Sequence, residues 1–154
     1  ILQAQLSVMP QLAQQGVVYA ARDISNAGVL GSLLMLLEAT QSGADIDLQK
    51  IPKPQNVDWQ TSLQIFPSYG FLLTADEGEC EEIIELFESQ GICCAVIGES
   101  NASGKVHVHD QKQSAQFWDF NQQEFTGFNY VGILKKLKAQ SDPIEPIEKE
   151  AAYA

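Results

Sequence analysis

The chain has 154 residues, 45% of them hydrophobic, and its 20 acidic against 9 basic side chains give a formal charge of −11. This length allows one compact domain with a real core. Nucleic acid and anionic membrane surfaces are excluded as partners, because binding either one needs clustered positive charge. The longest apolar run, residues 27–37, contains Gly31 and Ser32 and falls short of the ~20 residues that span a bilayer. We therefore expect no transmembrane helix.

The three cysteines, Cys80, Cys93 and Cys94, are odd in number and two of them are adjacent. A secreted disulfide scaffold has an even, spaced set, so we expect a reducing, cytoplasmic location. The chain begins at Ile1, and its first residues lack the basic stretch and the small-residue cleavage site of a signal peptide. We interpret the chain as an excised piece of a longer protein.

Apolar spacing predicts the elements of the first half of the chain. Residues 1–15 form an amphipathic helix that Pro10 kinks or starts, and 17–21 form a short buried strand. Residues 28–40 are apolar on nearly every side, which is typical of a helix buried between layers. The further elements predicted here are a polar turn over 23–28, a half-exposed strand over 44–48 and a short helix within 58–66.

The second half alternates predicted strands with one acidic helix. The strands are 71–74, a continuous apolar and central strand over 92–97, and two further strands over 105–110 and 113–120; the helix is 76–90, and a last helix is expected within 121–138. This order is too irregular for a parallel doubly wound sheet. We therefore predict an α+β fold, a mixed sheet layered with helices, over residues 1–141. Residues 142–154, acidic and containing two prolines, are expected to be a mobile tail.

The turn over residues 23–28, called the 23–28 turn below, is the first candidate for a functional site. A strand that feeds a helix through small residues leaves backbone amides unpaired at the helix N-terminus, where anions bind favourably. Gly28, Gly31 and Ser32 share one face of the predicted helix, which allows close approach of a ligand or another backbone. The alternative is that Asp23 or Ser25 simply caps the helix and the glycines serve packing.

Three stretches of the sequence, residues 21–31, 69–74 and 91–99, resemble motifs of one protein family in their order and spacing. They are similar to the C-terminal domain of aminoimidazole ribonucleotide (AIR) synthetase-like proteins. This superfamily also includes formylglycinamide ribonucleotide amidotransferase, selenophosphate synthetase, thiamine monophosphate kinase and the hydrogenase maturation dehydratase. The resemblance implies an AIR synthetase-related C-terminal domain over residues 1–141.

The same resemblance implies an ATP-dependent enzyme that activates its substrate by phosphoryl transfer, with ATP and Mg²⁺ as cofactors of the full-length protein. A missing N-terminal domain would supply most of the Mg-ATP ligands, and this domain would close one side of the cleft. Asp23, Ser25, Asn26 and Gly28 are the cofactor-binding residues that the resemblance carries over. It implies a small-molecule substrate, a homodimer at full length, and an isolated domain that is inactive and holds no cofactor tightly. The alternative is a noncatalytic domain retained for assembly or protein interaction.

Other residues are weaker candidates. Residues 68–70 precede a predicted strand and either approach the same cleft or form a strand-start turn. His107 and His109 lie two apart on one strand face, but they supply only two ligands where a metal needs three or four, so we expect no metal site. Cys93 and Cys94 are interpreted as members of a core strand rather than as nucleophiles. The carboxylates of the 76–90 helix are interpreted as a solvated face or an acidic docking surface.

Overall fold

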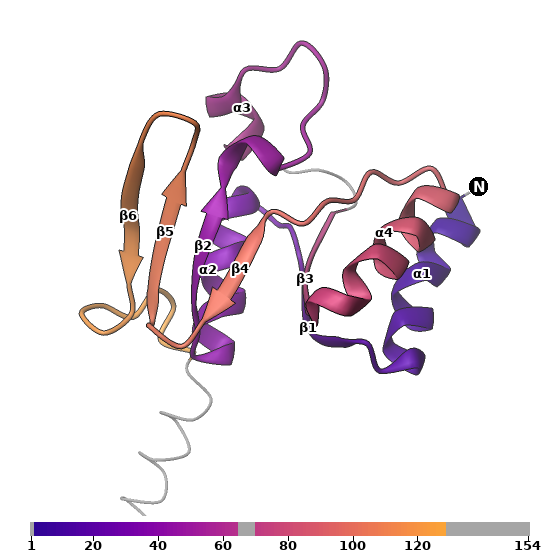
Figure 1. The fold of residues 1–154 in the computed structure, drawn as a ribbon, viewed down its shortest axis with the longest axis horizontal. Helices are drawn as coiled ribbons and strands as arrows, with labels where there is room; N and C mark the ends of the chain where they lie inside the picture. The colour runs from indigo at the N-terminus through magenta and orange to yellow at the C-terminus, as the bar shows by residue number, and fades with distance from the viewer. Residues whose placement is uncertain (1, 65–69, 129–154) are drawn as a thin grey trace, which may run out of the picture.

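The computed structural model describes residues 2–64 and 70–128. Figure 1 shows the arrangement of its elements. In chain order they are α1 (Leu2–Gln15), β1 (Val18–Asp23), α2 (Gly28–Thr40), β2 (Gly43–Asp47), η1 (Leu48–Lys50), α3 (Trp59–Gln64), β3 (Phe71–Ala75), η2 (Glu77–Glu79), α4 (Cys80–Ser89), β4 (Gly98–Asn101), β5 (Lys105–His109) and β6 (Ser114–Asp119).

The strands form two separate sheets. One is the antiparallel pair β1–β3, and the other has the order β4-β2-β5-β6. In the larger sheet β2 runs parallel to β5, whereas β4 and β6 are antiparallel to their neighbours. A mixed sheet combined with helices is an α+β fold, so this prediction is confirmed.

Helix α2 lies between the two sheets and supplies half of the buried residues of the main core. Its side chains pack against Leu72 of β3 and against Ala44, Ile46 and Val106 of the larger sheet. A helix with a sheet on each side must be apolar almost all round, which explains the sequence pattern over 28–40. The predicted bounds of this helix are confirmed.

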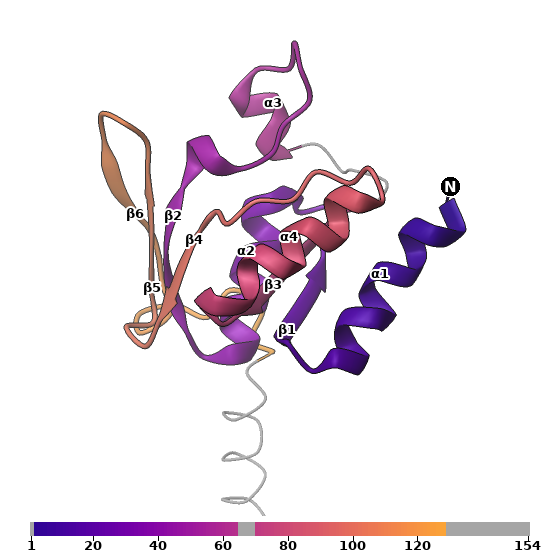
Figure 2. The same cartoon turned by 45° about the vertical axis from the view of Figure 1, so that its right-hand side comes forward.

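A second, smaller core holds α1 against α4. Its buried residues are Val8, Leu12, Ile83 and Phe87. Figures 1 and 2 show the two helices side by side, next to the β1–β3 pair. Pro10 lies inside α1 and is exposed, so its position facing away from this core accommodates the ring.

The structure corrects two predicted strands. Strand β1 alternates half-buried and exposed residues instead of being continuously buried, because α2 covers only one of its faces. Residues 92–97 form an extended loop, and the strand follows them as β4. Pairing with β2 decides this position: Gly98 lies opposite Ile46, where any Cβ would collide with the Asp45 carbonyl oxygen. A glycine is therefore needed at position 98, inside the β2–β4 ladder, whereas the sequence pattern predicted that the strand ends before this position.

Cys93 and Cys94 do not belong to a core strand. Cys93 is exposed and Cys94 is half-buried in the loop before β4.

The other predicted elements are close to their observed positions. The ends of four strands, β2, β3, β5 and β6, differ from the prediction by at most one residue. Helix α4 begins four residues later than predicted, and α3 falls within the predicted 58–66 range. Of the range 121–138, in which a last helix is expected, residues 121–128 are described and contain turns and bends but no helix. The rest of that range, the expected tail and residues 68 and 69 lie outside the described residues. Within 2–64 and 70–128 no helix is long and apolar enough to cross a membrane.

Candidate functional site at the start of helix α2

The 23–28 turn joins β1 to α2 and lies beside the start of β3. The backbone amide of Ile24 donates to the carbonyl of Gly70 at 2.8 Å, which ties the turn to the residue before β3. The amide of Gly28 donates to the carbonyl of Ser25 at 2.8 Å. Gly28 has a φ of +69°, a left-handed conformation that favours glycine. The sharp change of direction into α2 therefore depends on this glycine.

A buried serine fixes the shape of this turn. The side chain of Ser32 is 0% exposed, and its Oγ accepts a hydrogen bond from the backbone amide of Ser25 at 3.1 Å. Ala27 occupies the N-cap position of α2, and its methyl side chain makes no capping hydrogen bond. The alternative in which Asp23 or Ser25 caps the helix is therefore wrong.

The four residues carried over from the resemblance lie within this one turn but differ in exposure. Asp23 and Asn26 are exposed, Ser25 is half-buried and Gly28 is buried. The first amides of an α-helix have no acceptor within the helix, and they carry the positive end of its dipole. The Gly28 amide is already bonded to the Ser25 carbonyl, so the amides that follow it in the first turn are the ones that lack an acceptor within the helix.

Arg22 turns away from the exposed side of the turn. Its Nη2 contacts the Met35 sulfur at 2.9 Å, and its Nε is enclosed without a hydrogen-bond partner among the described residues. Neighbouring residues of a strand point to opposite faces, so Arg22 points toward α2 whereas Asp23 points outward. The arginine charge therefore lies behind the turn rather than on its surface. The sequence could have predicted this orientation of Arg22, because side chains alternate between the two faces of a strand.

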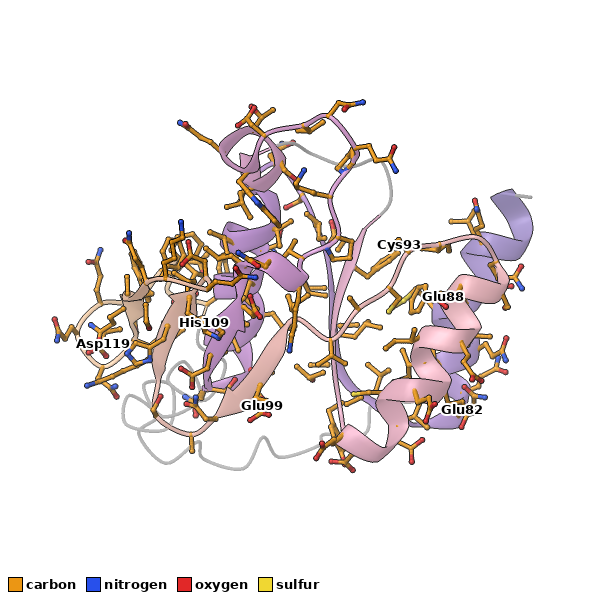
Figure 3. All side chains as sticks on the ribbon, turned by 45° about the horizontal axis from the view of Figure 1, so that its top comes forward. Glu82, Glu88, Cys93, Glu99, His109 and Asp119 are labelled. Atoms are coloured by element: carbon orange, nitrogen blue, oxygen red, sulfur yellow. The ribbon has the colours of Figure 1, made fainter. Side chains whose placement is uncertain are left out.

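The predicted pair of histidines lies on β5, next to β2. His107 Nδ1 is 3.5 Å from Asp45 Oδ1 across the parallel strand pair. Figure 3 shows His109 on this sheet and Cys93 on the other side of β4, beside α4, so the cysteines do not join the histidines. Among residues 2–64 and 70–128, no three His, Cys, Asp or Glu side chains gather to hold a metal. The absence of a metal site stays a prediction.

Sequence comparison relates the chain to proteins whose own length is much greater. An uncharacterized protein of Methanocaldococcus jannaschii, MJ0640, is 33% identical over 127 residues, which cover 82% of this chain. The chain spans only 39% of that relative.

Structure comparison relates the fold to parts of longer proteins. PurL of Thermotoga maritima, in a structure complexed with ATP, has a TM-score of 0.65 and 18% identity, covering 73% of this chain and 20% of PurL. The hydrogenase maturation protein HypE has a TM-score of 0.63 and 14% identity, covering 73% of this chain and 41% of HypE. Because the sequence identities are only 18% and 14%, these two similarities show a shared fold and nothing more.

The family assignment comes from the sequence over most of its length. Residues 1–111 match the family described as AIR synthase related protein, C-terminal domain. The matched region runs from α1 through β5, so it contains the 23–28 turn and both cores. The chain belongs to the AIR synthase related protein family, of which it carries the C-terminal domain.

Proposed function

We propose that this chain is the C-terminal, cleft-completing domain of an ATP-dependent enzyme that activates a small-molecule substrate by phosphoryl transfer. The observation that carries the proposal is the 23–28 turn, in which an uncapped helix N-terminus follows exposed Asn26 and Ala27. Family membership supports it. So does PurL, a protein of the same fold whose structure was determined with ATP.

The turn fits a phosphate group better than it fits a metal ion. Backbone amides at a helix start, together with the helix dipole, bind anions. Asn26 adds an exposed side-chain amide that donates hydrogen bonds. The rigid backbone set by Ser32 and Gly28 holds these donors in place before the ligand arrives, so little ordering is needed on binding.

Mg²⁺ takes six oxygen ligands and in nucleotide sites usually shares one or two carboxylates with the phosphates. Asp23 is the one carboxylate in the turn. We infer that an N-terminal domain supplies the remaining Mg-ATP ligands and that ATP lies between the two domains. When bound, Mg-ATP supplies the phosphoryl group, and the residues of this chain hold and orient its phosphates. The full-length enzyme is proposed to be a homodimer.

An affinity measurement on the protein that contains both domains tests this proposal. Asn26→Ala removes one donor and is expected to weaken binding of Mg-ATP by about 0.5–1.5 kcal/mol, roughly two- to tenfold. Gln116→Ala, which removes an exposed amide side chain from β6 on the larger sheet, is the matched control and is expected to leave affinity unchanged. Equal affinities of wild type and Asn26→Ala, measured by calorimetry on folded protein, would count against the turn as a phosphate site.

A further inference from the structure

Strand β6 forms one edge of the larger sheet and leaves its outer side open. It is the last strand in the order β4-β2-β5-β6, and among residues 2–64 and 70–128 no strand pairs with it on that side. Figures 1 and 2 show β6 as the outermost strand, far from α1 and α4. Its first four residues, Ser114, Ala115, Gln116 and Phe117, are all exposed. An edge strand of this kind presents unpaired backbone groups to another strand.

The hairpin that joins β5 to β6 shows which backbone groups point outward. The amide of Asp110 donates to the carbonyl of Gln113 at 2.9 Å, so these two residues form a hydrogen-bonded pair. Along an antiparallel ladder such pairs alternate with non-hydrogen-bonded pairs, whose N–H and C=O groups point away from each other. Counting from Gln113, the pairs that Ser114 and Gln116 form with β5 are of the second kind. The backbone groups of Ser114 and Gln116 therefore point to the open side of β6.

The two edges of this sheet differ in how they are protected against pairing with another chain. Strand β4, at the opposite edge, has only four residues and carries the charged Glu99. Short strands and charged side chains are two features that block pairing at an edge. Strand β6 has six residues without a proline, and its one charged residue, Asp119, is the last. Its ladder with β5 becomes irregular only at Phe117, so residues 114–116 form a regular, unprotected edge.

Charge and symmetry indicate a second copy of the chain as the partner of this edge. The formal charge of −11 makes two copies repel each other, whereas residues 113–117 contain no charged side chain. Two copies can therefore meet along this stretch without bringing carboxylates together. A two-fold axis at Ala115 places Ser114 of each copy opposite Gln116 of the other, so the outward-pointing backbone groups match. Two-fold contacts of this kind are the commonest in protein oligomers.

We propose that the domain associates with a second copy of itself by antiparallel pairing of β6 with β6. Ser114 and Gln116 form two symmetric pairs, each of which exchanges two backbone N–H···O=C hydrogen bonds. On the axis, Ala115 of one copy meets Ala115 of the other, with ~4.5 Å between their Cα atoms. The ring of Phe117, 39% exposed in the single chain, lies opposite Gln113 of the other copy and loses exposed surface. The contact lies within this domain and does not depend on ATP binding.

Sedimentation of the complete 154-residue chain over a range of concentrations tests this pairing. Wild type is expected to form a reversible dimer that is tighter at higher salt, because salt screens the repulsion between two acidic molecules. Ala115→Lys places two like charges opposite each other on the axis and is expected to weaken association at least tenfold. Ala102→Lys makes the same change at an exposed alanine between β4 and β5, and it is expected to associate at least as tightly as wild type.

A mixing experiment covers the case in which Ala115→Lys disturbs the fold. Ala115→Lys and Ala115→Glu are each expected to be monomeric, because like charges meet on the axis in either homodimer. An equimolar mixture of the two variants is expected to form a heterodimer, because opposite charges then face each other across the same axis. A misfolded variant could not recover association in this way, so recovery assigns the effect to the contact at Ala115.

Three results overturn the proposal. A wild-type chain that stays monomeric at every concentration and salt has no such contact. A wild-type dimer that Ala115→Lys leaves intact forms through another surface. A mixture of the two charged variants that stays monomeric contradicts a two-fold axis at Ala115. None of these results changes what the Mg-ATP titration of Asn26→Ala measures, so failure of this contact and failure of the proposed function are distinguished.

Discussion

Glu38 holds Thr126 through both the backbone amide and the side-chain hydroxyl of that residue, although 88 positions separate them in the sequence. Its carboxylate also accepts hydrogen bonds from the amides of Phe125 at 2.7 Å and Gly127 at 3.2 Å. The Glu38 side chain is only 4% exposed, near the C-terminal end of α2, where the helix dipole disfavours a negative charge. Four donors from one loop compensate for this placement and attach the loop to the core.

These contacts give the domain a pH-dependent stability. Burial raises the pKa of Glu38, but the hydrogen bonds from Thr126, Phe125 and Gly127 outweigh it, and the pKa lies below its ordinary value. The folded state therefore favours the ionised form. The resulting stabilisation is complete above the ordinary glutamate pKa of ~4.3 and is lost as the pH falls through the lower folded-state pKa.

Glu38→Gln is expected to lower the free energy of unfolding by about 1.5–3 kcal/mol at neutral pH, because the charged acceptor is removed from a buried site. The difference from wild type should shrink in acid, where Glu38 itself becomes protonated. Denaturant unfolding at pH 7 and pH 3 measures both effects. Glu124→Gln, which makes the same change of charge at an exposed position, is the control. A constant difference between wild type and Glu38→Gln across this range would contradict the assignment.

Ser32→Ala removes the acceptor that the Ser25 amide uses inside the protein. An amide left without its partner costs about 1–3 kcal/mol, so the variant should be less stable by this amount. Hydrogen exchange at the Ser25 amide should also become faster, because the turn opens more readily. Ser89→Ala, which removes an exposed serine hydroxyl bound to the Leu86 carbonyl, is the comparison and should leave Ser25 exchange unchanged.

Arg22→Met separates a role of the arginine charge from a role in packing. The enclosed Nε has no hydrogen-bond partner within the described part of the chain, so an apolar side chain of similar length should leave stability within about 1 kcal/mol of wild type or raise it. The positive charge behind the 23–28 turn is lost, and affinity for Mg-ATP in the two-domain protein should fall. A thermal melt and a nucleotide titration on the same sample distinguish the two roles of Arg22. A loss of stability above about 2 kcal/mol with unchanged affinity would make Arg22 a structural residue.

The isolated 154-residue chain is expected not to hydrolyse ATP. Phosphoryl transfer depends on Mg²⁺ held by carboxylates and on several groups arranged around the phosphates. The 23–28 turn offers only Asp23 as a carboxylate. Phosphate release is measured with Mg-ATP in excess, and Ser25→Ala is the control for a contaminating ATPase. Steady release by wild type that disappears in Ser25→Ala would show that the domain is active by itself.

The sequence predicted well the elements whose position follows from their own pattern of apolar and polar residues. Helix α2 lies between two sheets, and its all-round apolar surface is visible in the sequence. Strand β5 alternates along its length and was placed correctly. The 92–97 loop is a different case, because an apolar run does not reveal which residues a neighbouring strand will pair. Pairing of β4 with β2 over 98–101 was decided by tertiary contacts.

The candidate site was also only partly visible in the sequence. The small and polar residues before Gly28 were enough to predict that a strand, a turn and a helix follow one another there. The buried hydrogen bond from Ser25 to Ser32 was missed, although a serine on an otherwise apolar helix was a usable signal. The part played by Glu38 had no local signal, since its partners lie 87 to 89 residues away. Such contacts depend on the complete fold.

The central claim, that the 23–28 turn meets a phosphate, is tested most directly by titrating the two-domain protein with Mg-ATP after changing Gly28 and, as a control, Gly16. Both glycines have left-handed backbones, with φ of +69° and +72°, so Gly28→Val and Gly16→Val share a backbone strain of about 1–2 kcal/mol. Crowding adds to it at the buried Gly28 and not at the exposed Gly16, where a Cβ meets nothing within 4 Å. Only Gly28 lies in the turn. We expect Gly28→Val to weaken Mg-ATP binding at least tenfold while Gly16→Val binds like wild type. Unchanged affinity in a folded Gly28→Val protein would contradict the account.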